Sequence, residues 1–256
     1  MAEIAEWARQ RPWGVRLEWG LTGALALGPG SACVVVVDVL SFTTSVSVAV
    51  EAGTRVLPYP WRDGGAAEFA ARHGAELAVG RRAVSERQPW SLSPAALRCA
   101  PVAERLVLPS PNGSAISAAV SGVPVVAACL RNASAVARWI AGRGWGSARQ
   151  PVAVIAAGEH WPGRDGLRPA VEDWLGAGAV AAALARSAVG PLSPEAHAAA
   201  VAYGGIADVA ALIRDCASGR ELAEGGFAQD VAAATELDSS GVVPVLTDGA
   251  FVDAAR

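Results

Sequence analysis

The chain has 256 residues, of which 52% are hydrophobic and 18% are charged, and its formal net charge at pH 7 is −3. This balance is typical of a globular protein with a large core, and the small negative charge argues against a nucleic-acid surface. No apolar run reaches the ~18 residues of a membrane span, and the first residues (MAEIAEWARQRPW) lack the apolar core of a signal peptide. We therefore expect a cytoplasmic protein without a membrane or nucleic-acid partner.

Segments with strand and helix character alternate along the chain, which predicts an α/β fold with a mostly parallel or mixed sheet. Strands are predicted at Ala32–Leu40, Arg55–Tyr59, Glu76–Gly80, Arg105–Pro109, Val123–Ala128, Val152–Ala156 and Val242–Leu246. Helices are predicted at Thr43–Ala52, Gly65–His73, Gly113–Val120, Ala133–Ala141 and Ala170–Ser187, and then, in a helix-rich C-terminal part, at Pro194–Ala202, Ala207–Ala217 and Arg220–Ala223. We expect one domain over residues 1–256, and the polar connection at 142–150 is the one candidate for a subdivision.

The first predicted strand ends in an acid. In CVVVVDVLSFTTS, a run of β-branched residues typical of a strand buried on both faces leads directly into Asp38. An isolated buried carboxylate costs so much free energy that Asp38 must be solvated, paired or bound to a cation. The following helix places Thr43 and Thr44 nearby, with hydroxyls and backbone donors for a ligand.

Two later turns share one pattern, in which polar residues follow a strand and open a helix. SPNGS contains Asn112, Gly113 and Ser114, and LRNAS contains Arg131 and Asn132. Each is explained either as a turn with a helix cap or as an anion site that uses backbone N–H groups, and an arginine in the second case. In an open α/β sheet such turns lie beyond the carboxyl ends of strands, where ligands bind.

Two adjacent acids, Glu172 and Asp173, open the predicted helix with the apolar run WLGAGAVAAAL. The helix dipole readily explains one acid in the first turn. Oxygen ligation of a hard cation is the competing explanation for the pair, because Mg²⁺ binds one or two carboxylates together with substrate oxygens.

The absence of lysine and the spacing of the cysteines argue against several classes of enzyme. All 21 basic residues are arginine, so the phosphate-binding lysine of a P-loop and the Schiff-base lysine of a pyridoxal enzyme are absent. The same absence disfavours haloacid-dehalogenase-type phosphatases and isochorismatase-like hydrolases. The four cysteines (Cys33, Cys99, Cys129 and Cys216) form no CxxC pair, which argues against a zinc site or a disulfide framework.

The order and spacing of several stretches resemble the 2-phosphosulfolactate phosphatase family. These stretches are VVVVDVLSFTTS, SLSPAAL, LPSPNGSA, LRNASAVA, VIAAGE, VEDWLGAGAV, SGRELAEGG with QDV, and VVPV. The resemblance implies a three-layer α/β/α fold and Mg²⁺-dependent hydrolysis of a phosphate monoester, the family being known for a step of coenzyme M biosynthesis. The chain departs from the family in Ser41, where the family typically has arginine, and in Leu92, where it typically has asparagine. Arg131 and Arg168 are the candidates to replace the missing arginine.

These observations together predict a Mg²⁺-dependent phosphatase of a small anionic phosphomonoester. Asp38, Glu172 and Asp173 are the candidates for metal binding and catalysis. The alternative is a non-catalytic or repurposed member of the fold that binds a small anion, which Ser41 and Leu92 motivate. Nine tryptophans, among them Trp7, Trp13 and Trp19, either pack on their own domain or are partly buried in a homodimer, since tryptophan is often only partly buried and aromatic residues are enriched at interfaces.

Overall fold

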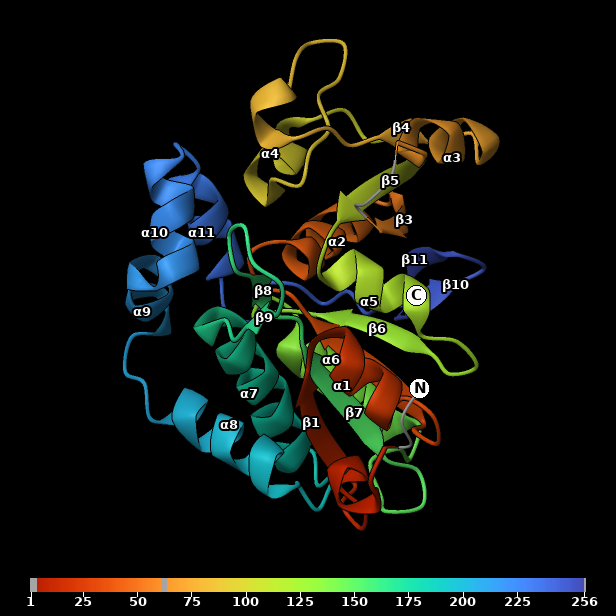
Figure 1. Ribbon diagram of the computed structural model, residues 1–256, viewed down its shortest axis with the longest axis vertical. Helices are drawn as coiled ribbons and strands as arrows, with labels where there is room; N and C mark the ends of the chain where they lie inside the picture. The colour runs from red at the N-terminus through yellow and green to blue at the C-terminus, as the bar shows by residue number, and fades with distance from the viewer. Residues whose placement is uncertain (1–3, 61–63, 256) are drawn as a thin grey trace.

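The computed structural model of the protein describes residues 4–60 and 64–255 (Figure 1). The described strands are β1 (Val15–Trp19), β2 (Cys33–Val37), β3 (Arg55–Pro60), β4 (Glu76–Leu77), β5 (Arg105–Ser110), β6 (Val125–Ala128), β7 (Val152–Ala156), β8 (Glu159–His160), β9 (Leu167–Arg168), β10 (Pro244–Thr247) and β11 (Ala250–Asp253). The described α-helices are α1 (Gly20–Leu27), α2 (Phe42–Glu51), α3 (Ala66–Arg72), α4 (Pro94–Cys99), α5 (Gly113–Ala119), α6 (Ala133–Gly142), α7 (Val171–Arg186), α8 (Pro194–Gly204), α9 (Val209–Asp215), α10 (Ala217–Glu224) and α11 (Ala228–Ala234). Two short 3-10 helices are η1 (Glu6–Arg9) and η2 (Arg81–Ala83).

Within the described residues, nine strands form one mixed sheet in the order β1-β7-β2-β6-β10-β11-β3-β5-β4. The strands β1, β7, β2 and β6 form one parallel block, and β3, β5 and β4 form another. The antiparallel hairpin β10–β11 joins the two blocks, because β10 pairs with β6 and β11 pairs with β3. A separate small hairpin is formed by β8 and β9.

Strand β2 lies in the middle of the first block and is completely buried, as its run of β-branched residues predicts. Cys33, Val35 and Val37 face a core cluster shared with α6, α7 and α8. Val34 and Val36 face the opposite cluster, which α1, α2 and α5 complete. The α/β/α arrangement is therefore confirmed, and the strand end that carries Asp38 is held on both faces.

Helix α7 approaches β2 closely because it has a glycine at the contact. A Cβ atom on Gly176 would lie 2.6 Å from Val39 Cγ2 and 2.8 Å from Val37 Cγ1, so no larger residue fits without a shift. This contact fixes the N-terminal turn of α7, which carries Glu172 and Asp173, relative to the end of β2.

Most predicted elements are present, but β1 and α1 were not predicted. Strands β2, β4, β6 and β10 are shorter than predicted, β3 and β5 extend one residue further, and β7 has the predicted bounds. Strand β1 carries Arg16 and Glu18, so it lacks a continuous apolar run, and it pairs with β7 at the end of the sheet order. The helices α4 and α11 and the strand β11 were also missed. The polar connection 142–150 lies between α6 and β7, and Ser147 and Gln150 form an isolated bridge within it.

The helices after residue 204 lie at one side of the molecule (Figure 1), where α11 packs against α4 and α10. Over the described ranges, no single helix is long and apolar enough to cross a membrane. The pair α8 and α9 passes that test by length and composition together but is bent by 102°.

Candidate active site

Asp38 lies at the carboxyl end of β2, is 3% exposed and accepts two backbone hydrogen bonds. The N–H of Phe42 donates to Oδ1 at 3.1 Å, and the N–H of Gly113 donates to Oδ2 at 2.8 Å. The second bond joins the ends of β2 and β5, strands that belong to different blocks of the sheet. Asp38 is therefore held in one orientation by the starts of α2 and α5.

Gly113 is required at this contact. A Cβ on this residue would lie 2.8 Å from Asp38 Oδ2 and 2.5 Å from Phe42 Cδ1. The hydroxyl of its neighbour Ser114 is fully buried and donates to the carbonyl of Leu108 at 3.2 Å. Of the predicted SPNGS site, the structure thus brings Gly113 to Asp38 and turns the Ser114 side chain back toward β5.

The hydroxyls of Thr43 and Thr44, which follow Asp38, form hydrogen bonds with nearby backbone groups. Thr43 Oγ1 accepts the N–H of Asp38 at 2.9 Å and donates to the carbonyl of the same residue at 2.8 Å. Thr44 Oγ1 donates to the carbonyl of Val39 at 2.8 Å. Both side chains are fully buried, so in this structure they shape the turn that presents Asp38.

Asp173 is held in the same manner as Asp38. Its Oδ1 accepts the N–H of Val39 at 2.7 Å, and its Oδ2 accepts the N–H of Gly158 at 2.8 Å. The carboxylate is 3% exposed and ties α7 to the turns after both β2 and β7. Since Val39 directly follows Asp38, this bond brings the first turn of α7 to the strand end that carries Asp38.

Glu172 is 2% exposed, and the thiol of Cys216, the N-cap residue of α10, donates to its Oε2 at 3.4 Å. A first-turn acid that only interacts with a helix dipole is solvated in most helices, so this depth of burial is not explained by the dipole alone.

A fourth carboxylate, Glu159 on β8, was not among the predicted site residues. Asn112 Nδ2 donates to Glu159 Oε2 at 2.8 Å, so the amide of the SPNGS turn does reach the acidic cluster. Arg168 lies opposite Glu159 in the β8–β9 pair, and its guanidinium donates to Ser218 Oγ at 3.0 Å. The signal in the sequence was the position of Glu159 three residues after β7, in a loop rich in polar residues.

We call Asp38, Glu159, Glu172 and Asp173 the carboxylate cluster, and its members repel one another. Burial, and to a smaller extent the charge of Glu172, raise the pKa of Asp38 to about 6. Burial and the charge of Asp38 raise the pKa of Glu159 to about 7. Burial, followed by the charges of Asp38 and Glu172, raises the pKa of Asp173 well above its ordinary value. The cluster therefore holds more negative charge than its surroundings offset.

Arg81 is a second residue that the sequence analysis missed. Its Nε donates to Asp230 Oδ2 at 2.8 Å, its Nη2 donates to Ser41 Oγ at 2.7 Å, and the guanidinium lies 5.7 Å from the ring centroid of Phe227. Its charge lowers the pKa of Asp38, against the larger effect of burial. A cation from η2 therefore stands beside Ser41, the position at which the sequence resemblance pointed to a missing arginine.

The predicted LRNAS site is built differently from the carboxylate cluster. Arg131 Nη2 donates to Glu51 Oε2 at 2.9 Å, and Arg131 Nε lies 3.5 Å from Glu236 Oε2. Asn132 accepts the N–H of Cys129 and donates to the carbonyls of Ala127 and Val242. The structure does not bring the polar groups of these two residues to the carboxylate cluster.

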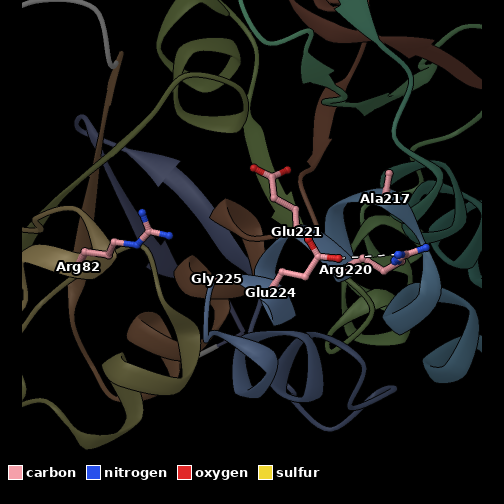
Figure 2. Close-up of a pocket in the computed structure, with 6 residues that line it drawn as sticks. All are labelled: Arg82, Ala217, Arg220, Glu221, Glu224 and Gly225. Atoms are coloured by element: carbon pink, nitrogen blue, oxygen red, sulfur yellow. Dashed lines mark ion pairs between the residues drawn. The ribbon is translucent and has the colours of Figure 1, made fainter.

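A hollow of about 500 Å³ lies outside the carboxylate cluster, between Arg82 and helix α10 (Figure 2). Arg82 stands across it from the α10 side chains, and Arg220 and Glu224 form an ion pair of 3.8 Å on the α10 side. Both partners are about three-quarters exposed, at 70% and 75%. This surface is therefore solvated, whereas the acids of the carboxylate cluster are largely shielded from solvent.

Among the described residues, no three or more histidine, cysteine, aspartate or glutamate side chains are grouped so that together they could hold a metal ion. The carboxylates of the cluster are oriented chiefly by backbone N–H groups and an amide. What the four carboxylates share is their position in the fold. Asp38 follows β2, Glu159 lies on β8 just after β7, and Glu172 and Asp173 lie in the first turn of α7.

Comparison with known proteins supports a phosphatase. A search of curated proteins finds no match to this chain. The model of the family described as 2-phosphosulpholactate phosphatase matches residues 26–249, a range that contains the whole carboxylate cluster together with Arg81, Asn112 and Arg168. The protein therefore belongs to the 2-phosphosulpholactate phosphatase family, a family of phosphoric monoester hydrolases.

Proposed function

We propose that this protein is a cytoplasmic, Mg²⁺-dependent phosphatase that hydrolyses a small anionic phosphomonoester, the phosphate ester of a 2-hydroxy acid, which is the class to which 2-phospho-3-sulfolactate also belongs. The observation that carries the proposal is the carboxylate cluster, in which Asp38, Glu172 and Asp173 are buried and Glu159 is half-buried. Burial together with the charges of neighbouring acids raises the pKa values of Asp38, Glu159 and Asp173. A structural role alone would not favour so much unbalanced negative charge in a protein interior.

The donor set fits a hard divalent cation. Carboxylate oxygens are the protein ligands that Mg²⁺ prefers, and the ion keeps several waters and substrate oxygens, so it does not need a complete protein cage. Two nearby arginines, Arg81 and Arg168, lower the pKa values of Asp38 and Glu159, but burial outweighs them. Because no three acidic side chains in the described part of the chain form a metal site by themselves, we propose that one or two of Asp38, Glu172 and Asp173 would hold the ion together with water and substrate oxygens. The ion, when bound, would lower the pKa of its water and offset charge on phosphoryl oxygens.

The chain's own residues would position the reactants. Backbone N–H groups fix the carboxylates of Asp38 and Asp173, so little reorganisation is needed when substrate binds. Arg81 and Arg168 supply the cationic side chains that bind the phosphate and the other anionic group of the substrate. Because phosphoryl transfer depends mostly on positioning and electrostatics, this arrangement suits hydrolysis of a phosphomonoester.

Glu159 is the group that we assign to proton transfer. Its Oε2 accepts the Asn112 amide, which leaves Oε1 to exchange a proton with water or with the leaving oxygen of the substrate. A carboxyl with a pKa of about 7 exists in both protonation states near neutral pH, as acid–base catalysis requires.

The test is phosphate release from a panel of phosphomonoesters with 5 mM Mg²⁺, chosen as roughly ten times a typical weak Mg²⁺ dissociation constant, and with EDTA instead. We expect release with Mg²⁺ and none with EDTA. Release that is indifferent to EDTA would contradict the metal role. Thermal stabilisation by phosphates or sulfonates without any release would instead support a non-catalytic anion-binding protein.

A further inference from the structure

A small hollow beside Arg81 has a different chemical character from the carboxylate cluster. Its volume is about 190 Å³, and we call it the Leu92 hollow. It is lined by Ala78, Val79, Gly80, Leu92, Pro109 and Pro111, with Arg81 at one side. Apart from Arg81, no lining side chain carries a polar atom, and the two prolines also lack an N–H.

The Leu92 hollow adjoins the candidate active site. Pro111 precedes Asn112, whose amide binds Glu159, and stands two residues before Gly113, which binds Asp38. Arg81 reaches from the hollow to Ser41 in the turn after Asp38. A molecule bound at the carboxylate cluster could therefore extend into the hollow.

The walls of the hollow are tied to the fold and to α2. The carbonyl of Leu92 accepts the hydroxyl of Ser45, a residue of α2, at 3.2 Å. On the other wall, the N–H of Val79 donates to the carbonyl of Trp90 at 2.9 Å. Leu92 and Ala78 also pack against the core cluster beneath α2. The hollow is thus largely formed before any ligand binds, as binding pockets usually are.

Arg81 can bind an anionic group at the edge of the hollow. Its two hydrogen bonds use two of the five N–H donors of a guanidinium, and Asp230, which is 1% exposed, fixes its orientation. The side chain is 19% exposed, so it remains accessible to a ligand.

We propose that the Leu92 hollow is a substrate subsite that takes a short apolar substituent, while Arg81 binds the carboxylate next to it. This inference rests on the proposed phosphatase function and makes its substrate class more specific. A sulfonate in the hollow would lose most of its hydration, which is costly for a charged group, because Arg81 is the one lining side chain with polar atoms and is already engaged by the carboxylate. The volume equals that of roughly six waters at about 30 Å³ each, enough for a branched group of a few carbons.

The test uses four 2-phosphooxy acids that differ in one substituent: hydrogen, methyl, isobutyl and sulfomethyl. We expect kcat/KM to rise by about 10-fold to 200-fold from the hydrogen to the isobutyl substrate. The sulfomethyl substrate should have the lowest kcat/KM of the four. Equal values for hydrogen and isobutyl, or a preference for sulfomethyl, would overturn the inference while leaving the phosphatase function intact.

Two variants test whether the preference for isobutyl over hydrogen arises in the Leu92 hollow. Leu92→Asn should lower the isobutyl-to-hydrogen ratio about 10-fold by placing an amide in the hollow, whereas Val102→Asn, at a side chain that is 66% exposed and outside the hollow, should leave the ratio unchanged. Circular dichroism checks the fold, and if Leu92→Asn does not fold, Leu92→Phe should lower the same ratio by filling the hollow. An unchanged ratio in the folded variant would show that the selectivity arises elsewhere.

Binding measurements separate the two proposals. Calorimetry with the four matched phosphonates, in which CH₂ replaces the ester oxygen, reports binding without turnover. Tighter binding of the isobutyl phosphonate than of the hydrogen phosphonate, by on the order of 10-fold, would support the subsite even if no ester is hydrolysed and the phosphatase function fails. Equal binding of the two would count against the subsite.

Discussion

Gly113 and Asp38 are 75 positions apart in the chain, and the N–H of Gly113 donates a 2.8 Å hydrogen bond to Asp38 Oδ2. Because a Cβ at this glycine would meet both that oxygen and Phe42, Gly113→Ala should push the ends of β2 and β5 apart. We expect a loss of stability of about 1–3 kcal/mol by urea denaturation, together with a loss of phosphatase activity. Gly142→Ala, where a Cβ meets nothing within 4 Å, is the matched control and should be neutral or slightly stabilising. Wild-type behaviour of Gly113→Ala would contradict this account of the contact.

Asp38→Asn should abolish activity and leave the fold intact. The amide keeps one acceptor but places an N–H₂ group against either Gly113 or Phe42, at a cost of about 1–3 kcal/mol. Removal of a buried charge offsets that cost at neutral pH, so the melting temperature should shift by only a few degrees, while phosphate release falls ~100-fold or more. Asp248→Asn, the same change at an exposed residue of the β10–β11 turn, is the control. A variant that melts early yet turns over normally with Mg²⁺ would show that Asp38 is a structural partner only.

The metal-free protein should become less stable as pH rises from about 4 to 7. The pKa of Asp38 is raised from 3.8 to about 6 and that of Glu159 from 4.5 to about 7, so the folded state binds more protons than the unfolded state over this interval. Stability contributed by such raised acids is present at low pH and is lost as pH rises through the folded pKa. Melting temperatures in EDTA between pH 4.5 and 7.5 measure the effect.

Two further measurements test whether the raised pKa values of these acids cause the loss of stability with rising pH. Glu159→Gln should flatten the decline between pH 5 and 7.5, because the neutral amide does not titrate. Mg²⁺ should raise the melting temperature more at pH 7.5 than at pH 5, since it binds ionised carboxylates. A melting temperature that rises from pH 5 to 7.5 in EDTA would refute the assignment.

Asp230→Asn should raise KM more than it lowers kcat, because Asp230 orients Arg81 without reaching the carboxylate cluster. The carboxylate accepts Arg81 Nε at 2.8 Å, the hydroxyl of Ser93 and the N–H of Ala95. Breaking a buried pair costs about 3–5 kcal/mol, so a lower melting temperature is also expected. Glu224→Gln, which breaks the exposed pair with Arg220, should change stability by under about 1 kcal/mol. A fall in kcat at constant KM would argue that Arg81 acts in the chemical step instead.

We propose that exposed tryptophans are covered in a homodimer. Trp7 is 85% exposed and Trp161 is 51% exposed, whereas Trp139, Trp145 and Trp174 pack against the core. Trp61 lies outside the described residues. Light scattering at micromolar concentration should give the mass of two chains, and Trp7→Ser should lower the dimer fraction. A monomeric mass for the wild type would rule the dimer out at that concentration.

The acids of the site could be predicted where a local pattern marks them. Asp38 ends an apolar strand, and Glu172 and Asp173 open an apolar helix, so each acid breaks a recognisable pattern. Arg81 could not be found in this way, because its partner Asp230 lies 149 positions away and no local pattern joins them. Glu159 was missed for a related reason, since its burial depends on a loop, two hairpin strands and Asn112 together.

Two turns with the same local chemistry have different surroundings. SPNGS and LRNAS both follow a strand and open a helix, and both were candidates for an anion site. The first faces Asp38 through Gly113, whereas the arginine of the second meets Glu51 on α2 and Glu236. The difference depends on which side chains the fold places opposite each turn, and a single sequence does not contain that information.

The hairpin β10–β11 lies between β6 and β3 in the sheet, although residues 244–253 form it. A ribosome that has reached residue 240 has made both parallel blocks without the segment that joins them. Pairings between distant segments form late and leave strand edges open in the meantime. Since Asp38 follows a strand of one block and Gly113 a strand of the other, we expect the nascent chain to acquire the geometry of its active site only after residues 244–253 have been made and have paired, with the edges of β6 and β3 open to chaperones until then.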